Sequence, residues 1–328
     1  DMDQLVQNPG HAIGAVPPPN PMFVVLSNQT VMASAIATHA PYYADPTGVL
    51  DSTAAIQSAI NAVATAGGGT VFIPAGKYRI DGNLVVGYSV TLQGEGGATD
   101  GTVLLALAGR DDAEAEPFIK TASADGGLLD LCIYYPEQTP GDIRPYPPTI
   151  DVYMAATLRN VLLCNSYNGI ELEYFNASVL ENIRGTVLKR GIFAPFSLEF
   201  SWMRDVDFSN RYWEEAFEAL EGTPMNAAAR DSLSLFTRQN LIALEVQRQD
   251  GLAIDGFRAD DAMLPVFMHP NTNHPDNVFG LGGLVYDFPE ARVEEGWMPW
   301  YYGMPYANMD RVPEVNGKQY AFAPIPMP

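Results

Sequence analysis

Hydrophobic residues recur in the middle of the chain at intervals of 22 to 23 residues. Segments 159–173 and 181–195 align with each other and place Val161 opposite Ile183, and a third segment continues the series at Val206. A fixed period of this length is typical of solenoids, in which each repeat forms one coil. Short strands, frequent turns and stacked aliphatic residues therefore predict a parallel β-helix.

Polar residues alternate with these aliphatic positions. Because side chains alternate across a strand, the flanking positions should point outward. They form two sets of three, Asn160, Asn182 and Asp205, and Leu162, Arg184 and Asp207. A fourth coil is expected over residues 241–255, after an insertion near residues 214–238 that has a helical pattern.

A helix is expected from Asp51 to Ala66, before the repeats begin. Apolar residues recur there at helical spacing, and Asp51 or Ser52 suits the helix start. Gly67–Gly69 ends the pattern, and residues 70–74 and 77–80 have the composition of short strands.

Residues 44–60 and 67–78 resemble the N-terminal motif of the pectate-lyase-like superfamily. That superfamily includes glycoside hydrolase family 55, polygalacturonase-related proteins and phage tailspikes. The resemblance implies an all-β fold, a right-handed parallel β-helix with an N-terminal capping helix, and it carries no catalytic site. We expect an N-terminal arm over 1–40, the β-helix over 41–295, and a C-terminal cap or linker over 296–328.

The net charge of the chain limits the classes of molecule that it is expected to bind. The chain has 39 Asp and Glu against 18 Lys and Arg, a formal net charge of −21, while 47% of its residues are hydrophobic. This composition belongs to a folded protein that repels phosphate backbones and anionic lipids. A neutral polysaccharide or oligosaccharide is the expected partner, with no nucleic acid and no membrane insertion. Cys132 and Cys164 are expected to be buried thiols, with one disulfide as the alternative.

Two pairs of carboxylates are candidate catalytic groups. Asp205 and Asp207 are two residues apart, which in a strand puts both on one face, with Cα atoms roughly 6.5 to 7 Å apart. Inverting glycosidases use a similar separation. The structural alternative makes Asp205 part of a polar ladder and pairs Asp207 with Arg184.

The second candidate site comes from aligning the coils at their glycines. The alignment predicts one outward column of Glu171, Phe193 and Ala253 and a neighbouring column of Glu173, Pro195 and Asp255. A sugar ring stacked on Phe193 would lie between acids. A solvated edge with a stray aromatic ring is the alternative.

Arg184 and several aromatic residues are the remaining candidates for substrate binding. Tyr134 and Tyr135 begin a proline-rich segment expected to protrude as a carbohydrate wall, or else to pack on the helix body. Tyr212 and Trp213 begin the helical insertion and are expected to overhang the same face. No cofactor or metal site is predicted, although the acidic group around Asp255 leaves calcium binding open.

The expected function is a secreted glycoside hydrolase that cleaves a neutral polysaccharide with two carboxylates. A lyase is less favoured, because few basic residues are expected on the outer face. The alternative is a structural or glycan-binding β-helix, such as a tailspike or adhesin stem or one half of a larger enzyme. A homo-oligomer and a missing C-terminal module also remain open. Two glycosylation-type sequons, at Asn28 and Asn176, favour secretion.

Overall fold

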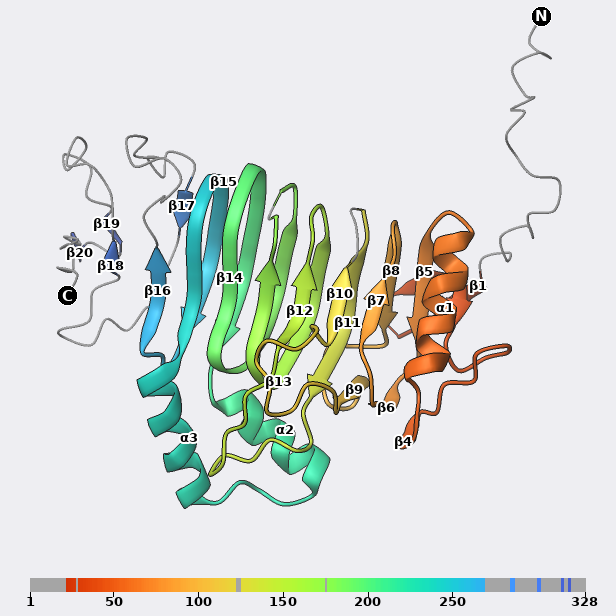
Figure 1. Cartoon of the computed structure of the whole chain (residues 1–328), viewed down its shortest axis with the longest axis horizontal. Coiled ribbons are helices and arrows are strands. Elements are labelled where there is room, and N and C mark those ends of the chain that lie inside the picture. Colours follow the sequence, from red (N-terminus) through yellow and green to blue (C-terminus); the bar gives the residue numbers. More distant parts are fainter. Residues whose placement is uncertain are drawn as a thin grey trace, which may run out of the picture.

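The computed structural model describes residues 22–268 except 28, 122–124 and 175, together with the short strands 284–286, 300–301, 314–315 and 318–319. Parallel strands wind into a coil along the long axis of the protein, with one helix at the N-terminal end and two helices alongside (Figure 1). Residues 1–21 of the predicted N-terminal arm and most of the predicted C-terminal segment lie outside the described residues. An all-β parallel coil is consistent with the predicted β-helix. No helix in the described part is long and apolar enough to span a membrane.

Each coil contributes a strand segment to three columns of parallel strands. The first column contains β3 (Ala35–Ile36), β5 (Gly69–Ile73), β8 (Val90–Gly94) and β17 (Leu284–Tyr286). The second contains β4 (Thr47–Asp51), β6 (Gly76–Ile80) and β9 (Thr102–Ala106). The third contains β7 (Leu84–Val86), β10 (Ile119–Thr121), β12 (Pro148–Val152), β16 (Leu264–Met268) and β18 (Trp300–Tyr301).

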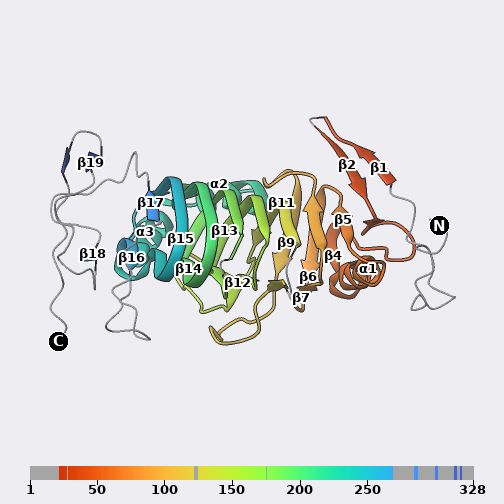
Figure 2. The same cartoon turned by 90° about the horizontal axis from the view of Figure 1, so that it is seen from above.

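Four long strands run around the corners and belong to more than one column. They are β11 (Gly127–Tyr134), β13 (Thr157–Leu172), β14 (Val179–Phe208) and β15 (Ile242–Ala259). Two antiparallel pairs lie outside the columns: β1 (Met22–Val25) with β2 (Thr30–Ala33), which projects from the coil in Figure 2, and β19 (Glu314–Val315) with β20 (Lys318–Gln319).

The core of the coil consists of the aliphatic positions predicted from the repeat. Val161 pairs in register with Ile183, and Val161, Ile183 and Val206 are each at most 1% exposed. Full burial of such a side chain stabilises the fold by about 1.5 to 3 kcal/mol. The prediction that these three residues point inward is confirmed.

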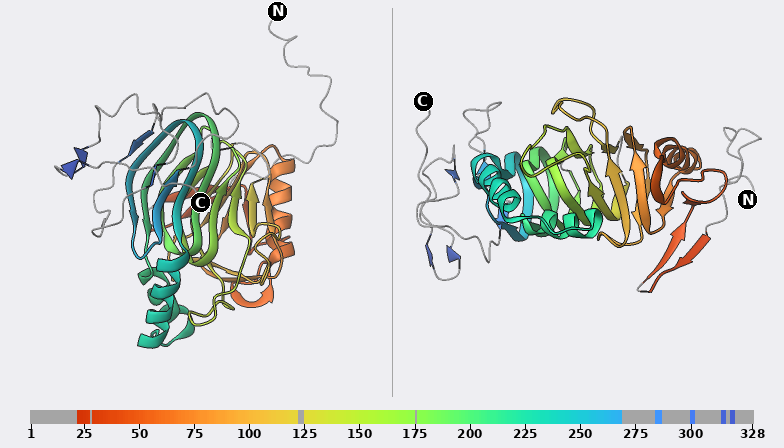
Figure 3. Two further views of the ribbon diagram at one scale, coloured as in Figure 1. Left: turned by 60° about the vertical axis from the view of Figure 1, so that its left-hand side comes forward. Right: turned by 90° about the horizontal axis from the view of Figure 1, so that it is seen from below.

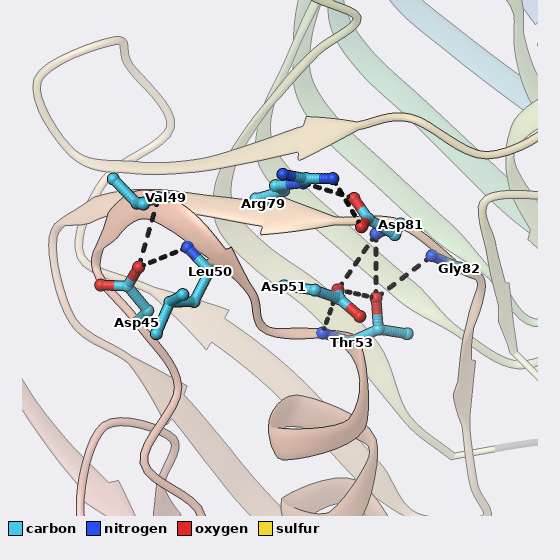
Figure 4. Close-up of polar contacts among 8 residues, drawn as sticks. All are labelled: Asp45, Val49, Leu50, Asp51, Thr53, Arg79, Asp81 and Gly82. Atoms are coloured by element: carbon cyan, nitrogen blue, oxygen red, sulfur yellow. Dashed lines mark hydrogen bonds and ion pairs between the residues drawn. The ribbon is translucent and has the colours of Figure 1, made fainter.

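Helix α1 (Thr53–Thr65) lies across the N-terminal end of the coil and buries Ile56, Ala59, Ile60 and Val63. Its start is held by Asp51, whose Oδ1 accepts hydrogen bonds from Thr53 N at 2.9 Å and Thr53 Oγ1 at 2.5 Å. Asp81 N donates to both of these side chains, and Gly82 N donates to Thr53 Oγ1 (Figure 4). The first turn of the helix is therefore tied to the chain at the end of β6.

The loop before β4 is held by a second carboxylate, Asp45. Its Oδ2 accepts from Val49 N at 3.2 Å and Leu50 N at 2.8 Å (Figure 4), and its Oδ1 accepts from Thr47 N at 3.0 Å. The N-terminal motif recognised in the sequence is thus a hydrogen-bonded closure of the coil end.

A ladder of polar side chains occupies the corner between the first and second columns. Asp130, Asn160, Asn182 and Asp205 all have positive φ, between 54° and 58°. Asn and Asp tolerate this left-handed conformation better than other residues with a β-carbon. Asn160 Nδ2 donates to Asp130 Oδ1 and Asn182 Nδ2 to Asn160 Oδ1, each at 2.7 Å.

Helices α2 (Arg211–Glu221) and α3 (Ala227–Asn240) follow the second column and lie against the coil (Figure 3). Trp213 and Leu233 pack there in a cluster with Cys132, Tyr134 and Cys164. Both cysteines are free, buried thiols, and their Sγ atoms are 3.1 Å apart.

The prediction of a protruding aromatic wall is wrong. Tyr134 is 1% exposed beneath α2, where its hydroxyl donates to Glu221 at 2.9 Å. Tyr135 is fully buried, with its ring centroid 4.6 Å from that of Tyr146. Trp213 is also fully buried and does not overhang the coil surface. Tyr134 and Trp213 are part of the packing between α2 and the coil, and Tyr135 is part of the core of the coil.

Candidate functional site

The third column carries a row of outward side chains in matched register. Ile170 and Leu172, on either side of Glu171, lie in the core, so Glu171 and its neighbours in register face away from the core. This outer row consists of Val85, Lys120, Asp151, Glu171, Phe193, Glu245 and Phe267. Neighbouring strands are about 4.8 Å apart, so successive members of the row can act on one sugar chain.

The outer row confirms only part of the predicted column. Glu171 and Phe193 are neighbours, but Glu245 occupies the place predicted for Ala253. Ala253 pairs with Trp202 and Asp255 with Arg204, both in the first column. The alignment failed because α2 and α3 replace a short turn, so the third-column segment of the fourth coil begins at Ile242.

Glu173 and Asp255 therefore do not form the predicted second column. Glu173 is exposed just beyond the end of β13, where its N–H donates to the Val152 carbonyl. Asp255 lies 3.9 Å from the guanidinium of Arg204 on another side of the coil. The two carboxylates belong to different surfaces.

Two cations and three carboxylates alternate on the outer row and beside it. Lys120 Nζ is 3.1 Å from Asp151 Oδ2, and Arg190 Nε is 2.8 Å from Glu245 Oε2. The Arg190 guanidinium also lies over the ring of Phe193, 4.5 Å from its centroid. Each cation is thus paired with a carboxylate of the outer row, while Glu171 has no ion-pair partner among the described residues.

Glu171 has the most unusual electrostatic environment in the outer row. Burial raises the pKa of its carboxyl group, the negative charge of Asp151 raises it further, and Arg190 opposes both effects. A carboxylate whose pKa is raised is a stronger base than an ordinary glutamate.

Aromatic rings flank the outer row at the end of the third column. The Tyr153 and Tyr174 ring centroids are 5.4 Å apart, and those of Tyr174 and Phe196 are 5.8 Å apart, both pairs edge to face. All three rings are half-buried, so each keeps some surface for contact. Such rings are suited to stacking against the apolar faces of pyranoses.

A separate groove of about 600 Å³ opens at the corner between the first and second columns. We call it the corner groove; it is lined by Asn182, Arg184, Asp205, Val206, Asp207, Arg211, Tyr212, Gly256, Phe257 and Arg258. It brings together four residues that the sequence proposed as functional, namely Asp205, Asp207, Arg184 and Tyr212.

The geometry of the predicted carboxylate pair differs from the prediction. Asp205 has φ +54°, so the backbone turns there and the two-residue spacing does not place both acids on one face of a regular strand. Asp207 pairs with Arg211, and its Oδ1 is 4.0 Å from Arg258 Nε, so Arg184 is not its partner. Tyr212 Oη donates to Asp207 Oδ2 at 2.7 Å.

Sequence reasoning missed Lys120, Asp151, Arg190 and Glu245 as members of the candidate site. Lys120 and Asp151 lie on short strands separated by irregular loops, so the 22-residue period does not reach them. No group of three or more His, Cys, Asp or Glu side chains placed to hold a metal ion occurs in the part of the chain that the structure describes.

Comparison with known proteins identifies similar sequences and folds. The family model described as rhamnogalacturonase A/epimerase, pectate lyase-like, matches residues 40–115. Mannuronan C5-epimerase AlgE5 of Azotobacter vinelandii is 36% identical over 97 residues, covering 26% of this chain and 9% of that protein. Alginate lyase 7 of the same organism is also 36% identical over 97 residues, covering 26% of this chain and 11% of the relative.

Among solved structures, the A-module of mannuronan C-5 epimerase AlgE4 from Azotobacter vinelandii is similar with a TM-score of 0.41 and 19% sequence identity. The match covers 72% of this chain and 68% of that module. The aligned region is only about a tenth of the length of the two curated relatives.

These relatives overturn one prediction and support another. They are named as epimerases and a lyase, so the prediction of a glycoside hydrolase is wrong. The N-terminal motif, the parallel coil and the matched family model agree with one another. The predicted resemblance to the pectate-lyase-like superfamily of β-helix proteins is thereby confirmed.

Proposed function

We propose that this protein acts on a polyuronate by removing the proton at C5 of a uronic acid residue. Mannuronan and alginate, the polymers in the names of the relatives, are chains of uronic acids. Removal of the C5 proton begins both epimerisation and β-elimination, the reactions of an epimerase and a lyase. Secretion, which the sequons favour, stays a prediction.

The chemistry requires a cation near the substrate carboxylate. The C5 proton lies next to that carboxylate, so its removal develops negative charge on the carboxylate oxygens, which a nearby cation stabilises. Lys120 and Arg190 place two such cations on or beside the outer row, each about 40% exposed. The outer row thus offers a polyuronate two cations at close range, despite the net charge of −21 of the whole chain.

The same step needs a base, and we assign it to Glu171. The carboxylate of Glu171 takes the C5 proton, and the electron pair of the C–H bond moves into the carboxylate group of the sugar. Return of a proton from water to the opposite face of C5 gives the epimer, and the resulting hydroxide takes the proton from Glu171. In β-elimination the electron pair forms the C4–C5 double bond, the C4–O bond breaks, and the proton held by Glu171 passes to the leaving oxygen. The raised pKa of Glu171, between Asp151 and Phe193, is the observation that carries this assignment.

Proton exchange at C5 is the direct test. The protein is incubated with mannuronan and with polygalacturonate in D₂O; deuterium at C5 is followed by NMR, and unsaturated uronate by ultraviolet absorbance. Glu171→Gln should lower the rate about a hundredfold or more, the usual effect of losing a general base. Glu218→Gln, an exposed glutamate on α2, is the matched control and should retain full activity.

Two outcomes would contradict the proposal. Hydrolysis of a neutral glucan without any deuterium incorporation into polyuronates would refute the reaction type. Full C5 exchange by a folded Glu171→Gln variant, checked by circular dichroism, would remove Glu171 as the base.

A further inference from the structure

The polar ladder at the corner has a fixed direction. Asp130 accepts hydrogen bonds at both carboxylate oxygens, from Asn160 Nδ2 at 2.7 Å and from Gln93 Nε2 at 3.1 Å. An ionised carboxylate only accepts, so Asn160 must turn its NH₂ group toward Asp130. Asn182 in turn donates to Asn160 Oδ1 and directs its own Oδ1 away from the ladder start.

One link of this ladder lacks a donor. The next side chain at the corner is Asp205, another carboxylate, so Asn182 Oδ1 meets a group that cannot donate to it when ionised. Asn182 Oδ1 is buried and has no hydrogen-bond partner. A buried acceptor without a donor costs folding free energy, so it is normally filled by water, an ion or a ligand.

The ladder stops, without the donor that Asn182 Oδ1 needs, at the mouth of the corner groove. The corner position after Asp205 is Gly256, with φ +73°, and a β-carbon placed there would lie 3.0 Å from Asp205 Oδ1. The ladder therefore ends where the next residue has no side chain, and Asn182, Asp205 and Gly256 all line the groove.

The rest of the groove adds a second buried acceptor without a hydrogen bond and an arginine without an ion pair. Asp207 Oδ1 has no hydrogen bond, although Arg258 Nε is 4.0 Å away. Arg184, Arg211 and Arg258 line the groove, and of these Arg211 pairs with Asp207 and Arg258 with Asp260 beside the groove. Within the described residues Arg184 has no ion-pair partner. A divalent cation would satisfy the oxygens but would meet three guanidinium groups at close range.

We propose that the corner groove binds a sugar acid, that is, a polyhydroxylated carboxylate such as a uronic acid. Hydroxyl groups of the ligand donate to Asn182 Oδ1 and Asp207 Oδ1, and its carboxylate accepts from the Arg184 guanidinium. This site lies at the corner between the first and second columns, apart from the outer row on the third column. It is a second binding site and does not depend on the catalytic assignment of Glu171.

Isothermal titration calorimetry of the full chain with sodium D-glucuronate, D-glucose and calcium chloride tests the proposal. Glucuronate should bind more tightly than glucose, because only glucuronate offers a carboxylate to Arg184. Arg184→Gln should weaken glucuronate binding about tenfold or more, as expected for a charge-assisted hydrogen bond. Lys189→Gln removes one exposed positive charge from the same strand outside the groove and should leave affinity unchanged.

Three results would overturn the sugar-acid site. The first two are equal glucuronate affinity in Arg184→Gln and Lys189→Gln, and equal affinity of the wild type for glucose and glucuronate. The third is a wild type that binds calcium but no glucuronate, with calcium binding abolished by Asp205→Asn. The proposed function fails separately, through the absence of C5 exchange on polyuronates. Glu171→Gln should abolish that exchange while keeping the glucuronate affinity that Arg184→Gln reduces.

Discussion

The carboxyl group of Glu171 gains its chemical character from its burial and from two charged neighbours rather than from its sequence context. Partial burial disfavours its ionised form, and Asp151 on the adjacent strand adds repulsion in the same direction. Arg190 pulls the other way from the next coil. Because the first two effects win, the pKa is raised, and a glutamate becomes a stronger base than it would be in water.

This balance predicts the pH dependence of activity. A base works when deprotonated, so the raised pKa of Glu171 puts the acid limb of the kcat/KM profile above the ordinary glutamate value of about 4.3. Asp151→Asn removes a negative charge beside Glu171, lowers the pKa of that carboxyl group and should shift the limb to lower pH. The measurement is the pH profile of C5 exchange.

Asp231→Asn, an exposed aspartate on α3, is the control for the loss of one negative charge. Its acid limb should coincide with that of the wild type. An upward shift of the limb in Asp151→Asn would show that a group other than Glu171 controls the rate.

At the scale of elements, the corner ladder predicts an unusual stabilising substitution. Asp205→Asn supplies an N–H donor for the unpartnered Asn182 Oδ1, and Asn also suits the positive φ of this position. We expect the free energy of unfolding to rise by about 1 kcal/mol, the net value of one hydrogen bond. Urea unfolding at neutral pH measures it.

The alanine variant separates the two effects of that substitution. Asp205→Ala removes the carboxylate without adding a donor and strains the left-handed backbone, so it should be less stable than the wild type. An Asn variant no more stable than the wild type would mean that another donor already fills the link.

A substitution at the start of α1 should instead lower the free energy of unfolding. Desolvation raises the pKa of Asp51, but hydrogen bonds from Thr53 and from Asp81 N outweigh it, so the net pKa is lowered. A lowered folded pKa contributes stability that is present above the unfolded value of about 3.9 and is lost as pH falls through the folded value. Asp51→Ala should therefore cost about 1 kcal/mol at pH 7, and the cost should shrink in acid.

Urea unfolding of the wild type and of Asp51→Ala at pH 7 and near pH 3 tests this prediction. Asp100→Ala, in an exposed loop, is the control and should change the free energy of unfolding by less than about 0.5 kcal/mol at either pH. A cost for Asp51→Ala that grows in acid would contradict the lowered pKa.

The sequence could predict those elements whose contacts repeat locally. Val161 and Ile183 stack because each coil repeats the last, so a period in the sequence is also a contact in space. The repeat could not predict the place of Glu245, because α2 and α3 interrupt the period. Phe193, with which Glu245 pairs in register, is 52 residues earlier. Tyr134 begins a segment whose composition is that of an exposed loop. It is buried only because α2, far along the chain, packs over it.

At the scale of the whole molecule, a large net negative charge accompanies a site that offers two cations. The net charge of −21 repels a polyanion at long range, which is why a neutral substrate was expected from the sequence. Lys120 and Arg190 act only within a few ångströms of a bound sugar. The repulsion by the whole chain and the attraction by the two cations therefore differ in range, and added salt, which screens charges, separates them.

Salt dependence tests this combination. The Debye length falls from about 30 Å at 0.01 M salt to about 10 Å at 0.1 M, so added NaCl removes the long-range repulsion before it weakens contacts at the outer row. We expect KM for a polyuronate to fall as NaCl rises over this range, with kcat little changed, in initial-rate measurements of C5 exchange. Potassium chloride at the same ionic strength should act equally, because screening does not depend on the identity of the monovalent cation. A KM that rises steadily from the lowest salt would mean that attraction at the outer row extends beyond the repulsion of the whole chain, and that the acidic excess does not govern the encounter.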